Sequence, residues 1–174
     1  DGMKKFAAIG SGLSQLIELS LSNNDIGDDG IYEFVKASAK GALPRLELLD
    51  LSKNKIEFNI AIEQGALPQL QRLYLEGNKI NEGLFTAVSS GALSQLRLLD
   101  ISSNKINGNG MISLSEVVQK EKLSKLQLLD LQYQEDLQYT DGGVKSFDTT
   151  LAKGFLPDLI ELYIDEEMDD RFNN

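Results

Sequence analysis

Residues 43–56 read LPRLELLDLSKNKI, and close copies of this stretch recur along the whole chain. Three close copies are LSQLIELSLSNNDI from Leu13, LPQLQRLYLEGNKI from Leu67 and LSQLRLLDISSNKI from Leu93. Two looser copies, LSKLQLLDLQYQEDL and LPDLIELYIDEEM, begin at Leu123 and Leu156. A unit that returns every 24 to 33 residues predicts a repeat architecture in which neighbouring units stack on one another.

The first four copies share the frame L-x-x-L-x-L-x-x-N, with Ile101 for the last leucine in the fourth, and apolar and other residues alternate in it. Alternation with a period of two predicts a half-buried strand, with leucines on one face and variable residues on the other. The asparagine that closes the frame has an amide with both donors and acceptors, which can satisfy backbone groups at a tight turn. We therefore expect a ladder formed by Asn24, Asn54, Asn78 and Asn104.

The segments between the strands change to a helical period. Ile31, Phe34 and Val35 stand at i, i+3 and i+4, which predicts a short amphipathic helix. The two short middle units have room only for an abbreviated helix. A glycine two residues before the opening leucine favours a helix stop in four copies, at Gly41, Gly65, Gly91 and Gly154.

The repeated frame resembles the leucine-rich-repeat family, and its strand-plus-helix unit resembles the ribonuclease-inhibitor-like class of that family. The resemblance implies an α/β right-handed solenoid, or horseshoe, with a parallel sheet on the concave side and helices on the convex side. It predicts a single leucine-rich-repeat domain over residues 1–174. This domain divides into a partial repeat 1–12, repeats 13–42, 43–66, 67–92, 93–122 and 123–155, and a terminal partial repeat 156–174. The ends are either capped, with the acidic run 165–170 shielding the last strand, or cut from a longer protein.

The composition disfavours several functional classes. A net charge of −10 and a pI near 4.5 disfavour nucleic-acid binding, which needs a surplus of Lys and Arg. The chain has no His, no Cys and no Gly-rich phosphate loop, so we expect no catalysis and no cofactor. The acidic run 165–170 lacks the spacing of a calcium loop and is better interpreted as a solvated tail, so we expect no metal.

The sequence gives only general indications of location. No apolar run approaches the length of a membrane span, so we expect no membrane insertion. The chain lacks a signal-peptide pattern, a glycosylation acceptor and cysteines. These features favour an intracellular location, in the cytosol or in the interior of an organelle.

The outward positions of the strands are the strongest candidate for a binding surface. The middle outward column reads Ser20, Asp50, Tyr74, Asp100, Asp130 and Tyr163. The flanking columns add the binding candidates Glu18, Arg72, Glu76 and Tyr133. Acids and tyrosines in one stripe would suit a basic protein partner with some apolar surface. Leu48, Leu98 and Leu128 also fall on this face, where they either pack on one another or form an apolar strip for the partner.

The fifth copy departs from the frame, because Gln134 stands where asparagine is expected. The turn that follows is longer and predicts a rim insertion that contains Glu135, Asp136 and Tyr139. Insertions in repeat proteins often lie on a binding face. The alternative is drift toward a terminal repeat, in which the ladder relaxes.

We expect a non-enzymatic module that binds a basic protein through an acidic, tyrosine-containing concave face. The family resemblance implies binding but names no partner. One alternative is a structural accessory subunit of a larger complex, held by its helices or edges. Another is a regulator, activator or inhibitor, of a partner enzyme or GTPase.

Overall fold

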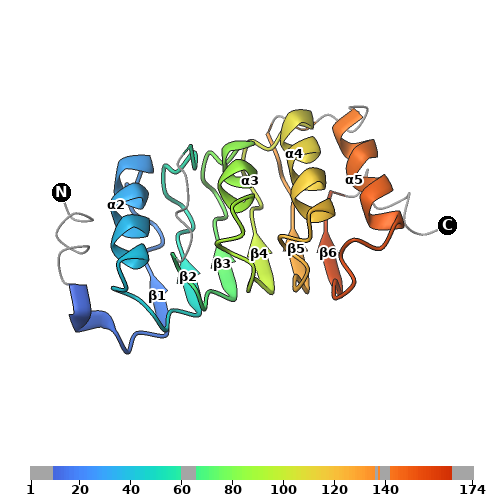
Figure 1. Ribbon diagram of the computed structural model, residues 1–174. Coiled ribbons are helices and arrows are strands. Elements are labelled where there is room, and N and C mark those ends of the chain that lie inside the picture. The colour runs from blue at the N-terminus through green and yellow to red at the C-terminus, as the bar shows by residue number, and fades with distance from the viewer. Residues whose placement is uncertain (1–9, 60–65, 136, 138–141, 166–174) are drawn as a thin grey trace.

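The computed structural model describes residues 10–59, 66–135, 137 and 142–165, which form stacked strand units (Figure 1). The strands form one parallel sheet in which each strand pairs with the next in chain order. They are β1 (Glu18–Ser20), β2 (Leu48–Asp50), β3 (Arg72–Tyr74), β4 (Leu98–Asp100), β5 (Leu128–Asp130) and β6 (Glu161–Tyr163). This arrangement confirms the predicted α/β leucine-rich-repeat solenoid.

The pairing is in register, so equivalent positions of successive repeats lie side by side. The middle residue of every strand is a leucine that pairs with the leucine of the neighbouring strand. Leu49, Leu73, Leu99 and Leu129 are at most 2% exposed. Each strand is too short to bury its leucine alone, and stacking therefore supplies the core that a single repeat lacks.

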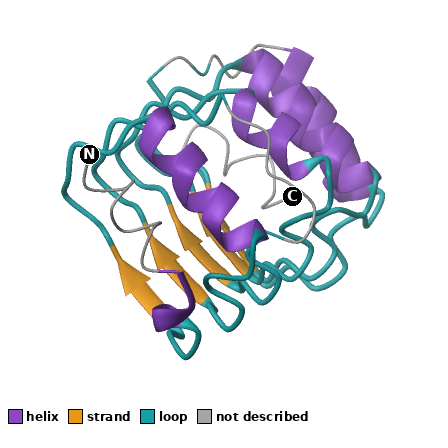
Figure 2. Ribbon diagram, turned by 60° about the vertical axis from the view of Figure 1, so that its left-hand side comes forward, coloured by secondary structure: helices purple, strands orange, loops and turns teal. Residues whose placement is uncertain are grey.

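The helices all lie on one side of the sheet, as Figure 2 shows. They are α2 (Asp28–Ala39), α3 (Gly83–Val88), α4 (Gly108–Gln119) and α5 (Gly142–Ala152), and a short 3-10 helix, η1 (Gly10–Leu13), precedes β1. Ile31, Phe34 and Val35 are buried on α2, as the helical spacing predicts. The third unit has the expected abbreviated helix in α3. In the second unit residues 57–59 are not helical, and the rest of the expected helix lies outside the described residues.

Asp28 holds the segment that replaces the start of a helix in the second unit. Its carboxylate accepts hydrogen bonds from the backbone N–H groups of Glu57, Phe58 and Asn59, each at 2.9 Å. Phe58 has a φ of 65° and is buried in the core. One side chain of the first repeat therefore fixes the backbone of the second.

The helices end as the glycine positions predict. Gly41, Gly91 and Gly154 have φ values of 87°, 82° and 75°, in the left-handed region that glycine enters without a side-chain clash. Gly65 lies outside the described residues. In the fourth unit Glu121, after α4, adopts the same conformation, with a φ of 57°.

One buried amide in each of the middle repeats joins that repeat to the one before it. The Asn78 Nδ2 lies 3.0 Å from both the Leu51 and the Leu75 carbonyl oxygens, and its Oδ1 accepts from the Ile56 N–H. Asn54 and Asn104 make the equivalent bonds. We call these side chains the rungs of the ladder.

Gln134 forms a further rung. Its Nε2 lies 2.8 Å from the carbonyl oxygen of Ile101, and its Oε1 accepts from the N–H of Ile106 at 3.0 Å. The longer side chain therefore reaches the groups that asparagine reaches elsewhere, so the ladder does not relax in the fifth unit. Asn24, by contrast, is exposed and donates only to Leu21 and Ser22 of its own unit in the described part of the chain.

Replacement of a buried rung should be far more destabilising than replacement of the exposed Asn24. Asn104→Ala leaves the Ile80 N–H and several carbonyl groups buried without partners, so we expect the free energy of unfolding to fall by roughly 3 kcal/mol. Asn24→Ala, the matched control, should lower it by less than about 1 kcal/mol. Urea denaturation followed by circular dichroism measures both, and equal losses would contradict the role of the rungs.

The residue before each rung position is left-handed. Asn23, Lys53, Gly77, Ser103 and Tyr133 have φ values between 54° and 66°. Only glycine takes this conformation without strain, so the non-glycine residues at this turn lower the stability of the folded state slightly.

Relief of this strain should stabilise the fold. We expect Ser103→Gly to raise the free energy of unfolding by about 1 kcal/mol, because glycine tolerates the φ of 54° at this position. The reverse change, Gly77→Ala, should lower it by a similar amount and serves as the matched comparison. Thermal and urea denaturation of both variants test this, and a destabilised Ser103→Gly variant would refute it.

Candidate functional site: the open face of the sheet

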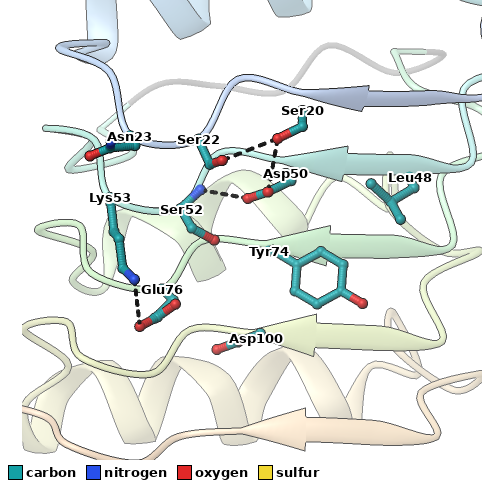
Figure 3. A pocket seen from close by; sticks show the side chains of 10 residues that line it. All are labelled: Ser20, Ser22, Asn23, Leu48, Asp50, Ser52, Lys53, Tyr74, Glu76 and Asp100. Carbon is teal, nitrogen blue, oxygen red and sulfur yellow. Dashed lines mark hydrogen bonds and ion pairs between the residues drawn. The ribbon is translucent and has the colours of Figure 1, made fainter.

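The residues on either side of each buried leucine project from the face of the sheet opposite the helices, called the open face below (Figure 3). The strand register places the predicted column side by side on successive strands. Its order across the sheet is Ser20, Asp50, Tyr74, Asp100, Asp130 and Tyr163. Neighbouring members stand one strand apart, about 4.8 Å, so the column is a continuous stripe.

The second column of the open face is of mixed character. Its order is Glu18, Leu48, Arg72, Leu98, Leu128 and Glu161. Arg72 Nη2 lies 2.8 Å from Glu18 Oε1, so this ion pair spans β2. Leu98 and Leu128 are register neighbours and both are half-buried, whereas Leu48 stands between Glu18 and Arg72. The leucines therefore form one adjacent pair and one isolated member.

The three aspartates of the first column each end their strand by capping the backbone. The Asp50, Asp100 and Asp130 Oδ1 atoms accept from the N–H two residues later, at 2.9, 3.0 and 3.0 Å. Such side-chain bonds to a nearby N–H are typical of aspartate at turns. The aspartates thus have a local structural role that the sequence analysis missed. In the sequence, only the position of these aspartates two residues before the turn indicated this capping role.

The second carboxylate oxygen distinguishes Asp50 from the other two. Asp50 Oδ2 accepts from the Ser20 hydroxyl at 3.0 Å. None of the described residues donates a hydrogen bond to Oδ2 of Asp100 or of Asp130. Two carboxylate oxygens that accept no hydrogen bond from the described residues therefore lie on the neighbouring strands β4 and β5.

Carboxylates outnumber cations on the open face. The acids are Glu18, Asp50, Glu76, Asp100, Asp130, Glu161 and Asp165, and the cations are Arg72 and Lys53. Lys53 Nζ lies 3.7 Å from Glu76, and Arg72 is paired with Glu18. In the described part of the chain no Lys or Arg pairs with Asp50, Asp100 or Asp130. A cation from outside the chain would meet uncompensated negative charge here.

The pKa values of the aspartates follow from these surroundings. Burial raises the pKa of Asp130, and the nearby charges of Asp100, Asp165 and Glu76 raise it further against the backbone bond from Gln132. Burial also acts to raise the pKa of Asp50, but the hydrogen bonds from Ser52, Ser20 and Ser22 outweigh it, so this pKa lies below its ordinary value. Asp130 therefore sits in an excess of negative charge, while Asp50 is locally satisfied.

A shallow hollow of about 620 Å³ occupies the open face over β1 to β4 (Figure 3). It is lined by Ser20, Ser22, Asn23, Leu48, Asp50, Ser52, Lys53, Tyr74, Glu76 and Asp100. In Figure 3 the Tyr74 ring lies between the Asp50 and Asp100 strands. The hollow is open and mixed in polarity, which is suited to a protein surface rather than to an enclosed small molecule.

The predicted tyrosines at the far end are accessible. Tyr163 is 43% exposed, and its hydroxyl donates to Glu161 Oε2 at 2.6 Å. This bond raises the pKa of Tyr163, because loss of the proton would place two negative charges together. Tyr133 is 67% exposed at the rim, where its backbone N–H donates to Asp165.

The predicted rim insertion is described only in part. Glu135 pairs with Lys105 at 3.1 Å, whereas Asp136 and Tyr139 lie outside the described residues. The described residues contain no group of three or more His, Cys, Asp or Glu side chains placed to hold a metal ion. Among the helices in that part of the chain, none is long and apolar enough to cross a membrane.

Comparison with known sequences identifies the repeat. A profile of the leucine-rich-repeat family matches residues 14–35 and 93–115. No curated protein matches the sequence. The chain therefore contains repeats of the leucine-rich type.

Solved structures of the same fold come from different kinds of protein. The tropomodulin C-terminal domain of Caenorhabditis elegans is similar at a TM-score of 0.57 and 12% identity, over 98% of this chain and 89% of that one. The leucine-rich-repeat ectodomain of the Arabidopsis thaliana receptor kinase GASSHO1/SCHENGEN3 is similar at 0.51 and 24% identity, over 91% and 17% of the two chains. An internalin (inlF) of Listeria monocytogenes is similar at 0.50 and 21% identity, over 94% and 46%. The chain thus spans less than half of the receptor ectodomain and of the internalin.

Asp50→Asn and Asp130→Asn should change the pH dependence of stability in opposite senses. Because the pKa of Asp50 is lowered in the folded state, its ionised carboxylate stabilises that state at pH values above the unfolded-state pKa of about 3.9. This stabilisation is lost as the pH falls through the folded-state pKa. Because the pKa of Asp130 is raised in the folded state, its ionisation lowers the free energy of unfolding at pH values above the folded-state pKa. This destabilisation fades as the pH falls from the folded-state pKa to the unfolded-state pKa of about 3.9.

At pH 7, Asp50→Asn should therefore lower the free energy of unfolding relative to the unmodified chain, and Asp130→Asn should raise it. The Asp130→Asn difference should shrink as the pH falls from the raised folded pKa toward about 3.9, and the Asp50→Asn difference should shrink as the pH falls below about 3.9. Asparagine retains the oxygen that accepts the turn N–H, so the turn cap is kept; at position 50 the acceptor of the Ser20 hydroxyl is lost together with the charge. Urea denaturation at pH 7 and at about pH 3 measures it, and effects of the same sign at pH 7 would contradict the assigned environments.

Proposed function

We propose that the chain is a protein–protein interaction module that binds a basic segment of another protein through its open face. The leucine-rich-repeat fold supports the coarser statement, that of a protein-binding module without catalysis. The finer statement rests chiefly on one observation. Asp50, Asp100 and Asp130 stand in one column of the sheet, and no cation of the described chain pairs with them.

The electrostatics of this column favour a basic partner over a neutral one. Half-buried carboxylates have lost part of their hydration, and Asp130 also lies near the charges of Asp100, Asp165 and Glu76. A partner cation would offset this repulsion, and the long-range field would speed its approach. Tyr74 and Tyr163 add amphipathic contact area of the kind enriched at interface hot spots.

The Arabidopsis receptor ectodomain was solved in complex with CASPARIAN STRIP INTEGRITY FACTOR 2. That structure shows a leucine-rich-repeat fold of similar geometry serving as a binding platform. At 24% identity the likeness extends to the fold alone, and the identity of that partner carries no information about the partner of this chain.

A structural accessory role is the second candidate. Tyr32 on α2 and Ile112 on α4 are 45% and 40% exposed, so the helical side also offers apolar contact. These two side chains lie on helices that are separated by α3 (Figure 1). Neither belongs to a continuous column of similar residues like the one on the open face. The open face is therefore the better supported surface.

The test is charge neutralisation on one face at a time. The open-face variant combines Asp50→Asn, Asp100→Asn and Asp130→Asn, which keep the turn-capping oxygens. The matched variant combines Asp29→Asn, Glu33→Gln and Glu116→Gln, which remove the same charge from α2 and α4. We expect the open-face variant to bind a protein captured by the unmodified chain roughly ten-fold or more weakly, because three ionic contacts are lost.

The measurement is affinity capture from the native source with mass spectrometry, followed by titration of the captured protein against each variant. The helix variant should retain full affinity, and salt raised from about 0.15 to 0.5 M should weaken binding by the unmodified chain. If the helix variant loses affinity while the open-face variant keeps it, the accessory role replaces the proposal.

A further inference from the structure

Four consecutive strands place two neighbouring carboxylates between two aromatic rings. The register pairs Tyr74 with Asp100, Asp100 with Asp130, and Asp130 with Tyr163. The other end of the same column differs, because there a single acid, Asp50, follows Ser20. Tyrosine rings attract cations over their faces, and carboxylates attract them directly. The segment from β3 to β6 is therefore the part of the open face best suited to a cation.

An apolar pair lies beside this acid pair. Leu98 and Leu128 are register neighbours on β4 and β5, two residues before Asp100 and Asp130, and both are half-buried. They offer a small apolar surface next to the carboxylates. Long basic side chains have this same division, with an apolar stem and a charged head group.

The free oxygen atoms fix where the head group would bind. Asp100 and Asp130 each use Oδ1 to cap the turn N–H, at 3.0 Å in both cases. Their Oδ2 atoms accept no hydrogen bond from the described residues, whereas Asp50 Oδ2 is occupied by Ser20. The raised pKa of Asp130, which burial and the charge of Asp100 help to produce, agrees with an acid pair that lacks its counter-ion.

We propose that Tyr74, Leu98, Asp100, Leu128, Asp130 and Tyr163 form a docking subsite for one arginine side chain of the basic partner. This inference rests on the proposed function and names the side chain that the open face selects. The guanidinium group is planar and carries donors on two edges, so it can bond both carboxylates while its face stacks on tyrosine. An ammonium group is a compact, strongly hydrated point charge and satisfies fewer of these contacts at once.

The first experiment uses small probes and the unmodified chain. N-acetyl-arginine amide, N-acetyl-lysine amide and N-acetyl-citrulline amide are titrated into labelled protein and followed by NMR. Citrulline has nearly the shape of arginine without its charge. We expect arginine to bind about three-fold or more tightly than lysine, and citrulline to bind undetectably, because both the charge and the fork geometry contribute.

The affected amides should belong to β3 to β6 and to the turns that follow them. Shifts centred on β1 and β2, or spread evenly over the sheet, would overturn the subsite. Lysine binding as tight as arginine would overturn the selectivity that defines it.

Single substitutions then separate the subsite from the general negative charge. Asp100→Asn and Asp130→Asn should each weaken the binding of the arginine probe about five-fold or more, since each removes a charged acceptor. Asp50→Asn removes the same charge from the same column and should weaken it less, because its Oδ2 is already occupied. The double variant Asp29→Asn, Glu116→Gln on the helices should leave the affinity of the probe unchanged.

An equal loss for Asp50→Asn and Asp130→Asn would show that the acids act only as diffuse charge and would overturn the subsite. The proposed function would survive that result if the open-face triple variant still failed to bind the captured protein. If the probe experiments succeed and the triple variant keeps full affinity for that protein, the proposed function fails while the arginine subsite stands as a measured property.

Discussion

The hydrogen bonds of one buried amide in each of four consecutive repeats hold the register on which the rest of the molecule depends. Asn54, Asn78, Asn104 and Gln134 each bond their own turn and the turn before it, where neighbouring backbones meet. Because the strands stay in register, a given position of one repeat lies beside the same position of the next. A slip of one residue would turn the leucines outward and the aspartates into the core. The in-register pairing of the strands therefore aligns the open-face side chains and packs the core leucines at the same time.

The sequence predicts most of this arrangement because the repeat is periodic. Alternation around Leu49 or Leu99 assigns each residue to a face, and equal spacing then aligns Asp50, Tyr74 and Asp100 on neighbouring strands. The short helix α3 also follows from the length of its unit. The role of Gln134 could not be predicted, because it depends on how far a longer side chain reaches within a particular turn.

The differences among the open-face acids were likewise beyond the sequence. Asp50, Asp100 and Asp130 occupy equivalent positions and look alike in the repeat frame. Their chemistry separates only when the partners of each oxygen and the burial of each carboxyl are known. Ser20 satisfies Asp50, whereas Asp130 lies among other acids. The repeat frame therefore explains where the three aspartates lie, and the residues that differ between repeats explain why their hydrogen bonds and pKa values differ.

The rungs also have a direction. Each buried amide reaches back to the preceding repeat, as Asn54 does to Leu21 and Ile26, and Asn104 to Leu75 and Ile80. A turn is therefore completed by the repeat that follows it in the chain. During synthesis from the amino end, a turn can therefore gain the hydrogen bonds of this amide only after the repeat that follows it has been made.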